Sequence, residues 1–180
     1  MDVTKFKIAK NGKVTVSFKV LKRTEGDREI WSRVTLVSDE TIHYDLQGAL
    51  VQLRPFVVDL LELPKKEENR IKVTGAEFTM TKKEGIFGAQ IYALRSLDHS
   101  NIPQEVVTPH KTEVPYNIEG EVEEGLLLDE ECVQILKQLQ EEAESYVKGH
   151  KDQFGLFNGG MRQAEQPKEQ EQKNGKSEGS

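Results

Sequence analysis

The chain has 180 residues, of which 36% are hydrophobic and 31% charged, a composition that suits one globular domain of about 100 to 150 residues with appendages. No apolar run is long enough to cross the roughly 30 Å hydrocarbon layer of a membrane, and the N-terminal segment lacks the apolar core of a signal peptide. A single cysteine, Cys132, excludes an intramolecular disulfide and a CxxC metal site. We therefore expect a protein of the reducing cytoplasm.

The formal net charge of -6 conceals a strong asymmetry along the chain. Residues 1–33 carry nine Lys or Arg against four acids, whereas residues 121–145 carry nine acids against Lys137 alone. Two solvated surfaces are the ordinary interpretation of such runs. The same polarity is expected of a protein that holds a polyanion at one end and keeps the other end away from it.

Residues 3–37 predict three antiparallel strands, at 3–9, 13–23 and 29–37. The Asn11-Gly12 pair favours a tight hairpin between the first two. In the second strand polar residues alternate with Val14, Val16, Phe18 and Val20, although Leu21 breaks the alternation. In the third strand the inward positions are Ile30, Val34 and Leu36.

The outward positions of these strands carry five basic residues and one large aromatic. They are Lys5, Lys7, Lys19, Arg23, Trp31 and Arg33. Basic groups neutralise phosphates, and an exposed indole offers a surface on which an unpaired base stacks, worth about 1–3 kcal/mol per base. The alternative is that Trp31 packs under a loop or against the C-terminal helix.

Residues 41–64 form the one long helical pattern in the first two thirds of the chain. Pro55 predicts either a kink or two successive helices. The apolar stripe consists of Leu46, Leu50, Leu53, Val57 and Leu60. Two further strands are expected at 70–80 and 86–94, with a β-bulge at Gly75 that restores the apolar face.

The β-β-β-α-β-β order predicts an α+β, mainly β fold that resembles the OB-fold, a small barrel, with a helix appended at its C-terminus. We expect the barrel in residues 1–96 and an irregular strap in residues 97–128, with Val106-Val107 as a candidate edge strand. The open alternative is an antiparallel sheet with both helices on one face.

A second helix is expected at 129–149, followed by a disordered tail at 150–180. The apolar stripe of this helix consists of Cys132, Leu136, Leu139, Ala143 and Tyr146.

The segment that follows this helix contains Gln153-Phe154-Gly155-Leu156-Phe157. This pentapeptide resembles the short peptides by which bacterial replication and repair proteins dock on the sliding clamp. In such a peptide the amide of Gln153 would hydrogen-bond at the mouth of a groove, while Leu156 and Phe157 would fill an apolar pocket. The alternative is that the apolar residues fold back on the domain as an anchor.

The chain as a whole resembles a group of small, mostly uncharacterised proteins of tailed bacteriophages and prophages. The matching stretches are LRPFVVDLLELP, RIKVTGAEF, VVTPHK and the helix that leads into QFGLF. The resemblance implies a setting in phage DNA replication or recombination and supplies no catalytic residue. Phage single-stranded-DNA-binding proteins of the OB type commonly end in an acidic, aromatic tip, and the sequence GKSEGS departs from that pattern.

Motifs for catalysis or metal binding are not found in the sequence. No phosphate-binding glycine loop, dinucleotide fingerprint or nucleophile elbow occurs. The four histidines show no metal-ligand spacing with each other or with the cysteine. They are His43, His99, His110 and His150. We therefore expect neither an enzyme nor a cofactor.

Two functional hypotheses follow. In the first, the chain is a non-catalytic protein of phage replication or recombination that binds single-stranded DNA through the basic, Trp-bearing strands and docks on the sliding clamp or another replication protein through Gln153, Leu156 and Phe157. In the second, it inhibits a host replication or defence protein, with the acidic helix at 129–148 as the contact surface. Both place it in the cytoplasm of a bacterial host, and both leave its oligomeric state open.

Overall fold

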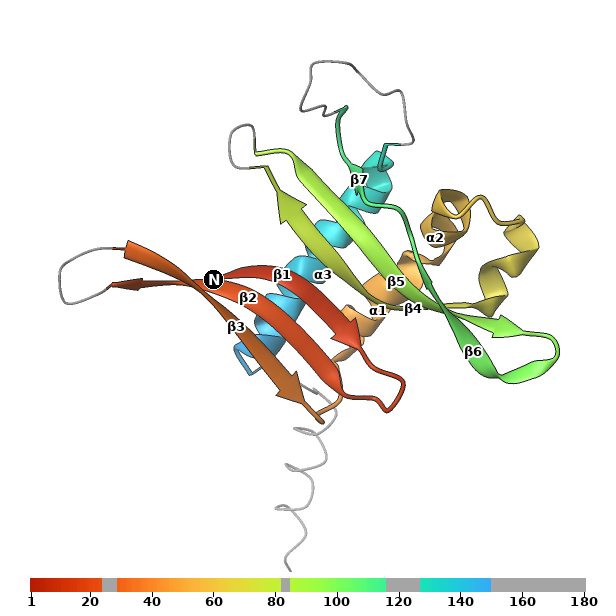
Figure 1. Cartoon of the computed structure of the whole chain (residues 1–180), viewed down its shortest axis with the longest axis horizontal. Helices are drawn as coiled ribbons and strands as arrows, with labels where there is room; N and C mark the ends of the chain where they lie inside the picture. The colour runs from red at the N-terminus through yellow and green to blue at the C-terminus, as the bar shows by residue number, and fades with distance from the viewer. Residues whose placement is uncertain (24–28, 82–84, 116–126, 150–180) are drawn as a thin grey trace, which may run out of the picture.

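The computed structural model describes residues 1–23, 29–81, 85–115 and 127–149. Its seven strands are β1 (Asp2–Ile8), β2 (Val14–Arg23), β3 (Glu29–Ser38), β4 (Ile71–Met80), β5 (Phe87–Leu97), β6 (Ser100–Val107) and β7 (Lys111–Thr112). They form one antiparallel sheet with the order β3-β2-β1-β4-β5-β6, in which β7 pairs with β5 (Figure 1).

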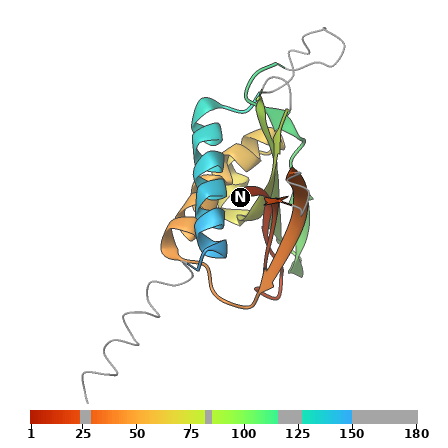
Figure 2. The ribbon, with the colours of Figure 1, turned by 90° about the vertical axis from the view of Figure 1, so that its left-hand side faces the viewer.

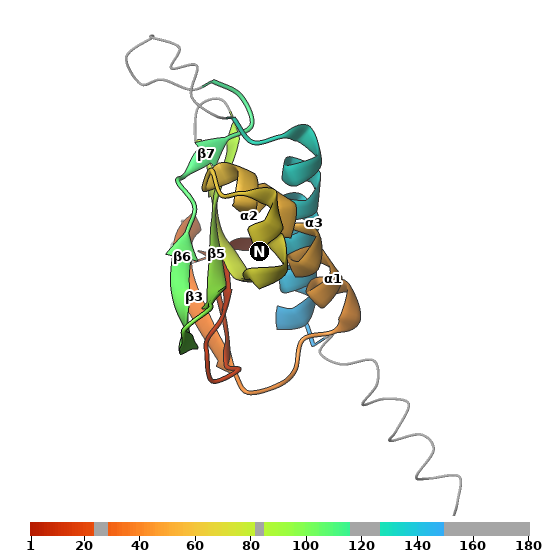
Figure 3. The same cartoon turned by 90° about the vertical axis from the view of Figure 1, so that its right-hand side faces the viewer.

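The helices cover one face of this sheet and leave the other face open. They are α1 (Tyr44–Gln52), α2 (Arg54–Leu60) and α3 (Glu130–Val147), with a 3-10 turn, η1 (Lys65–Arg70), before β4. Figures 2 and 3 show the helices on one side and the strands on the other. The core lies between these two layers. We call the uncovered side of the sheet the open face. No helix in the described ranges is long and apolar enough to traverse a membrane.

The fold is α+β with a mainly antiparallel sheet, as the sequence predicts, and the sheet is open. Among the described residues β3 pairs with β2 and β6 pairs with β5, so these two strands are the edges, and closure into a barrel is not seen. The arrangement corresponds to the open alternative, with the helices on one face. Its element order repeats a β-β-β-α unit, because β1 to β3 lead into α1 and β4 to β6 lead into α3.

The predicted alternation of the first three strands is confirmed, but Ile30, predicted to face inward, is 50% exposed because the β2–β3 hairpin extends beyond β1 there. Val14 and Val16 are buried on the helix side, while their neighbours Thr15 and Ser17 are half-buried on the open face. The β-bulge predicted at Gly75 is also confirmed, since the register of β4 against β5 shifts between Val73 and Gly75.

The central helical pattern forms two helices, as Pro55 predicts. α1 ends at Gln52 and α2 begins at Arg54, which places the proline in the first turn of α2, where its missing N–H leaves no hydrogen bond unmade. All five residues of the predicted stripe are buried.

The prediction of an irregular strap is wrong for residues 100–105 and 111–112, which form most of β6 and all of β7, whereas the candidate edge strand at Val106-Val107 is confirmed as the end of β6. Pro103 weakened the strand pattern there. In the structure Pro103 has no partner in the β5–β6 ladder, because it lies opposite the register shift between Arg95 and Leu97. The N–H group that proline lacks therefore removes no hydrogen bond from the sheet.

The C-terminal helix also matches its predicted stripe, all of which is buried. Asp129 caps it by accepting a hydrogen bond from the backbone N–H of Glu131 at 2.8 Å. The far end of α3 is tied to the start of α1. There the hydroxyl of Tyr146 donates to the carbonyl oxygen of Glu40 at 2.8 Å. The predicted disordered tail, residues 150–180, lies outside the described residues.

The two β-β-β units meet through one short ladder between β1 and β4. Only three pairs form it, Lys5 with Glu77, Phe6 with Ala76 and Lys7 with Gly75. The two backbones approach closely at the bulge, where a Cβ on Gly75 would overlap the carbonyl oxygen of Phe6 and lie 2.7 Å from the Cα of Lys7. Glycine is therefore required for the junction. The helices reinforce it, since α3 packs on β1 and α1 packs on β4.

The substitution Gly75→Ala tests this junction. Overpacking typically costs about 1–3 kcal/mol. We expect this substitution to lower the free energy of unfolding by an amount near the upper end of that range, because the backbone rather than a flexible side chain must move. Urea unfolding followed by circular dichroism measures the effect. The matched control is Gly48→Ala in α1, where a Cβ would meet no atom within 4 Å and helix propensity predicts a gain of about 0.5–1 kcal/mol. Equal stability of Gly75→Ala and the wild type would contradict the role given to this glycine.

Candidate nucleic-acid interface

All six residues predicted for the nucleic-acid surface lie on the open face. The ladder places Lys19 opposite Arg33 and Leu21 opposite Trp31, with Lys5 and Lys7 on the same side of the adjacent strand. Trp31 is 60% exposed, so the alternative in which it packs under a loop or a helix is wrong. The hairpin of β2 and β3 extends beyond the start of β1, and Trp31 lies on this projecting part.

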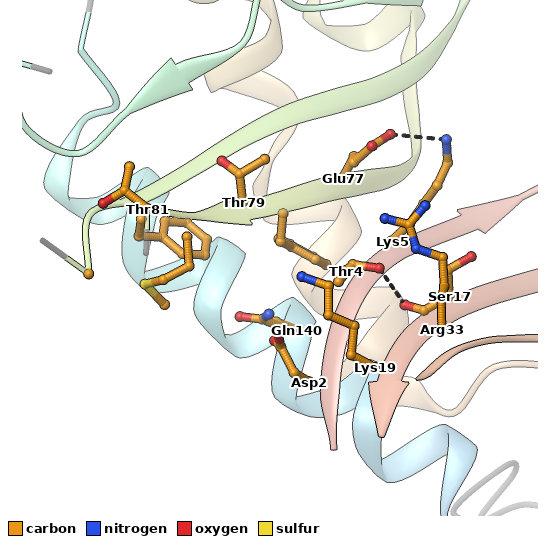
Figure 4. Close-up of a pocket in the computed structure, with 14 residues that line it drawn as sticks. Asp2, Thr4, Lys5, Ser17, Lys19, Arg33, Glu77, Thr79, Thr81 and Gln140 are labelled. Atoms are coloured by element: carbon orange, nitrogen blue, oxygen red, sulfur yellow. Dashed lines mark hydrogen bonds and ion pairs between the residues drawn. The ribbon is translucent and has the colours of Figure 1, made fainter. Parts of the chain in front are cut away.

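Three of the five predicted cations line a single pocket, at the point where β1 and β4 diverge (Figure 4). The pocket has a volume of about 730 Å³ and is lined by Lys5, Lys19 and Arg33, together with the carboxylates of Asp2 and Glu77. We call this pocket the α3 notch, because Gln140 of α3 also lines it.

Gln140 holds the free edge of β1 beside the α3 notch. Its side-chain amide donates to the carbonyl oxygen of Val3 at 2.6 Å. Val3 lies outside the three-pair ladder with β4, so this hydrogen bond replaces a missing strand partner.

A closed hydrogen-bonded triad occupies the centre of the open face, directly over the β1–β4 ladder. The hydroxyl of Tyr92 donates to Glu77 at 2.7 Å, and the ammonium of Lys5 donates to both Glu77 and Tyr92 at 3.1 Å. The ammonium groups of Lys5 and Lys7 lie 4.7 and 5.0 Å from the centroid of the Tyr92 ring. The triad thus bonds β1 to β4 and β5 on the side that has no helix.

The triad shifts the pKa of each member. The hydrogen bond from Tyr92, followed by that from Lys5, lowers the pKa of Glu77. Partial burial and then the bond to Glu77 raise the pKa of Tyr92. For Lys5, burial favours the neutral form, but the hydrogen bonds to Tyr92 and Glu77 outweigh it and raise the pKa. All three shifts keep the pair ionised and the phenol protonated at neutral pH.

The six predicted residues therefore differ in what they can offer a ligand. Lys5 is engaged by Glu77, and Arg23 forms an exposed ion pair with Glu29 at 3.8 Å, which is worth little. Within the described ranges Lys7, Lys19 and Arg33 form no ion pair with an acid. These three cations and the exposed indole of Trp31 are the groups that remain available to a polyanion.

The helix layer carries the opposite charge. α3 contains five Glu and one Lys along its 18 residues, and all five Glu lie outside the buried stripe. The charge asymmetry that the sequence shows along the chain therefore appears in the fold as a basic sheet face and an acidic helix face. A polyanion is attracted to the open face and repelled from α3.

Tyr92, Glu77 and Gln140 are the residues that sequence analysis did not assign to this surface. Tyr92 alternates with Ile91 and Ala93 in an ordinary strand pattern, and the partners of the triad are 72 and 87 residues apart in the sequence. Such contacts follow from the order of strands in the sheet. A local pattern does not encode that order.

One group of described residues could hold a metal ion, although the sequence shows no metal-ligand spacing. Candidate ligand atoms of His43, Asp45 and Glu142 lie within 4.8 Å of one another. Nε2 of buried His43 already meets Glu142 at 2.7 Å, which ties α1 to α3 on the helix side of the molecule.

The single cysteine does not supply a nucleophile. Burial raises the pKa of the Cys132 thiol to about 12, so at neutral pH it stays protonated in the core.

No protein-family model matches the chain, and the searches of curated proteins and of solved structures yield no match either. The interpretation of the open face therefore rests on its geometry and charge. The pentapeptide predicted to dock on the sliding clamp, with Gln153, Leu156 and Phe157, lies outside the described residues.

The lowered pKa of Glu77 predicts a pH-dependent contribution to stability. A carboxyl whose folded-state pKa is depressed stabilises the fold above its unfolded pKa of about 4.3, and this contribution disappears as pH falls through the folded value. At neutral pH we expect the urea midpoint of the wild type to be higher than that of Glu77→Gln. As the pH falls below about 4.3, the two midpoints should converge. The control is Glu105→Gln, which removes an exposed pair with Lys10 at 3.8 Å and should change little at any pH. A gap between wild type and Glu77→Gln that persists unchanged at low pH would refute the triad's role.

Proposed function

We propose that the chain is a non-catalytic protein that binds single-stranded DNA across its open face. The observation that carries the proposal is the register of β2 and β3, which puts an exposed indole beside unpaired cations on a side of the sheet free of helices. Lys19 and Arg33 contact phosphates at the α3 notch, and Lys7 extends the cationic path to the middle of the sheet. Trp31 stacks on a base, a contact that only an unpaired strand offers.

The use of β2 and β3 is the feature that this proposal shares with OB-fold proteins, which bind single strands across the same pair. Closure of the barrel is not required for it, since the phosphate and base contacts come from one continuous surface. The resemblance of the chain to phage proteins supports a setting in phage replication or recombination, in the cytoplasm of the bacterial host.

A second candidate function, binding and inhibition of a host replication or defence protein, is favoured by the acidic outer surface of α3. A basic partner would be attracted there by the same charge that repels DNA. Recovery of a host protein from a nuclease-treated lysate, together with its loss in a Glu141→Gln/Glu144→Gln variant, would support this candidate over the first.

Binding of oligo-dT tests the first proposal, and the only tryptophan, Trp31, reports it directly. We expect quenching of its fluorescence and an affinity that falls with salt. For Lys19→Gln/Arg33→Gln the slope of log affinity against log salt should become shallower by about 1.4, because each lost contact to a single strand removes about 0.7. For Trp31→Ala, measured by anisotropy of a labelled oligonucleotide, affinity should fall by about 1–3 kcal/mol.

The matched control is Lys65→Gln/Lys66→Gln, which removes two exposed cations carried by η1 rather than by the sheet. Its affinity and salt slope should equal those of the wild type. Lack of binding at low salt, or equal losses in the control and in Lys19→Gln/Arg33→Gln, would reject the open face as the interface.

Docking on the bacterial sliding clamp through Gln153, Leu156 and Phe157 is the partner half of the proposal. It is supported by the pentapeptide pattern and by the position of this segment four residues after Gly149, where the described helix has ended.

The variant Leu156→Ala/Phe157→Ala should lose binding to immobilised clamp in surface plasmon resonance, because its two apolar anchors are gone. Its urea midpoint should equal that of the wild type. Met161→Ala, an apolar change in the same tail outside the pentapeptide, serves as the control. Unchanged clamp binding would reject docking, and a lowered urea midpoint would indicate that the residues anchor the tail on the domain instead.

A further inference from the structure

A second pocket lies at the opposite end of the β1–β4 ladder. There the end of β1 at Ile8 and the start of β4 at Lys72 diverge again, and the gap is floored by α1. The pocket has a volume of about 320 Å³, within the range of small-molecule sites. We call it the α1 notch. In the repeated β-β-β-α architecture it is the counterpart of the α3 notch.

The charged residues of the α1 notch are all cations. Lys10, Arg54 and Lys72 line it, and no Asp or Glu does. The Nε of Arg54 is buried without a hydrogen-bond partner, and the guanidinium forms no ion pair within the described ranges. Among the described residues Lys10 forms an ion pair with Glu105 alone, at 3.8 Å on an exposed surface. A buried N–H group that lacks an acceptor costs free energy, and an anion would supply the acceptor. The charge of this pocket is therefore complementary to an anion.

The remaining lining of the α1 notch is mostly apolar, with three polar side chains, of which Thr74 already donates to the carbonyl oxygen of Tyr92 at 3.2 Å. Leu50 and Val73 are buried at its base, and Val51 is 45% exposed. Thr41 and Gln47 also line it, and their side chains hydrogen-bond to no described residue. An apolar base suits a flat ring, and free hydroxyl and amide groups suit the polar edge of that ring. A ligand that consisted only of an acyl chain would leave both polar groups unused.

The α1 notch is continuous with the open face. Ile8, Lys10 and Leu94 line both this notch and a shallow depression on the open face, and the depression also includes Lys7 and Tyr92. The cationic path that starts at Arg33 and Lys19 therefore passes Lys7 and reaches the second notch.

We propose that the α1 notch binds one unstacked nucleotide, with its base against Leu50 and Val73 and its phosphate on the guanidinium of Arg54. The inference rests on the proposed function, because it identifies this nucleotide as part of the single strand that crosses the open face. It differs from stacking on Trp31, since here the base is enclosed and its edge faces Thr41 and Gln47. Lys10 and Lys72 flank the phosphate.

Binding of thymidine monophosphate to the full chain, followed by isothermal titration calorimetry, tests the inference. We expect the nucleotide to bind the wild type, and Arg54→Gln to weaken binding about tenfold or more, because a charge-assisted contact is lost. Lys72→Gln, an exposed change that leaves the core untouched, should weaken it by a smaller factor. Lys65→Gln/Lys66→Gln should bind the nucleotide like the wild type.

Two further ligands show whether the base and the phosphate both contribute to binding. Thymidine without phosphate should bind much more weakly than the nucleotide, and inorganic phosphate should do so as well. Phosphate that binds as tightly as the nucleotide would overturn the base pocket, as would undiminished binding by both Arg54→Gln and Lys72→Gln. Nucleotide binding without oligo-dT binding would overturn the open-face interface and keep the pocket. Oligo-dT binding without nucleotide binding would overturn the pocket alone.

Discussion

The close approach of β1 to β4 is the constraint on which the rest of the molecule depends. Three residue pairs join two β-β-β units into one sheet, and the backbones meet where Gly75 has no side chain. Because so short a ladder leaves the strands free to diverge at both of its ends, the sheet has a notch on either side of the junction. A longer ladder would close both notches.

The junction is reinforced from both faces by different kinds of contact. On the helix side each helix covers the junction strand of the other unit, α3 on β1 and α1 on β4, which buries apolar surface across the boundary. On the open face the triad of Lys5, Glu77 and Tyr92 bonds the two strands with polar groups that remain partly accessible. The same residues thereby keep the middle of the open face hydrophilic.

Much of this could be predicted from the sequence, and the remainder has a common physical cause. Burial of one face of a strand imposes a period of two. The alternation of Val14, Val16 and Phe18 was therefore sufficient to place Lys19 on the opposite side, and that of Val34 and Leu36 to place Trp31 and Arg33. The stripes of the helices, the division at Pro55 and the bulge at Gly75 are likewise local patterns.

Spatial neighbours far apart in the chain could not be predicted. The element order fits both a barrel and an open sheet, and the choice depends on whether the edge strands meet. Pro103 reads locally as a strand breaker, and only its place at a register shift makes it compatible with β6. The triad and the α1 notch require the β1–β4 pairing, which joins segments about 70 residues apart in the sequence.

The central claim is that a single strand of DNA lies along the open face, across the junction between the two units. Amide chemical shifts of isotope-labelled protein titrated with a short oligo-dT test it most directly. We expect the amides of β1, β2 and β3 to shift, with a second group at Lys72 and Leu94, while those of α3 other than Gln140 stay in place. Shifts confined to the outer surface of α3, or spread evenly over both layers, would contradict it.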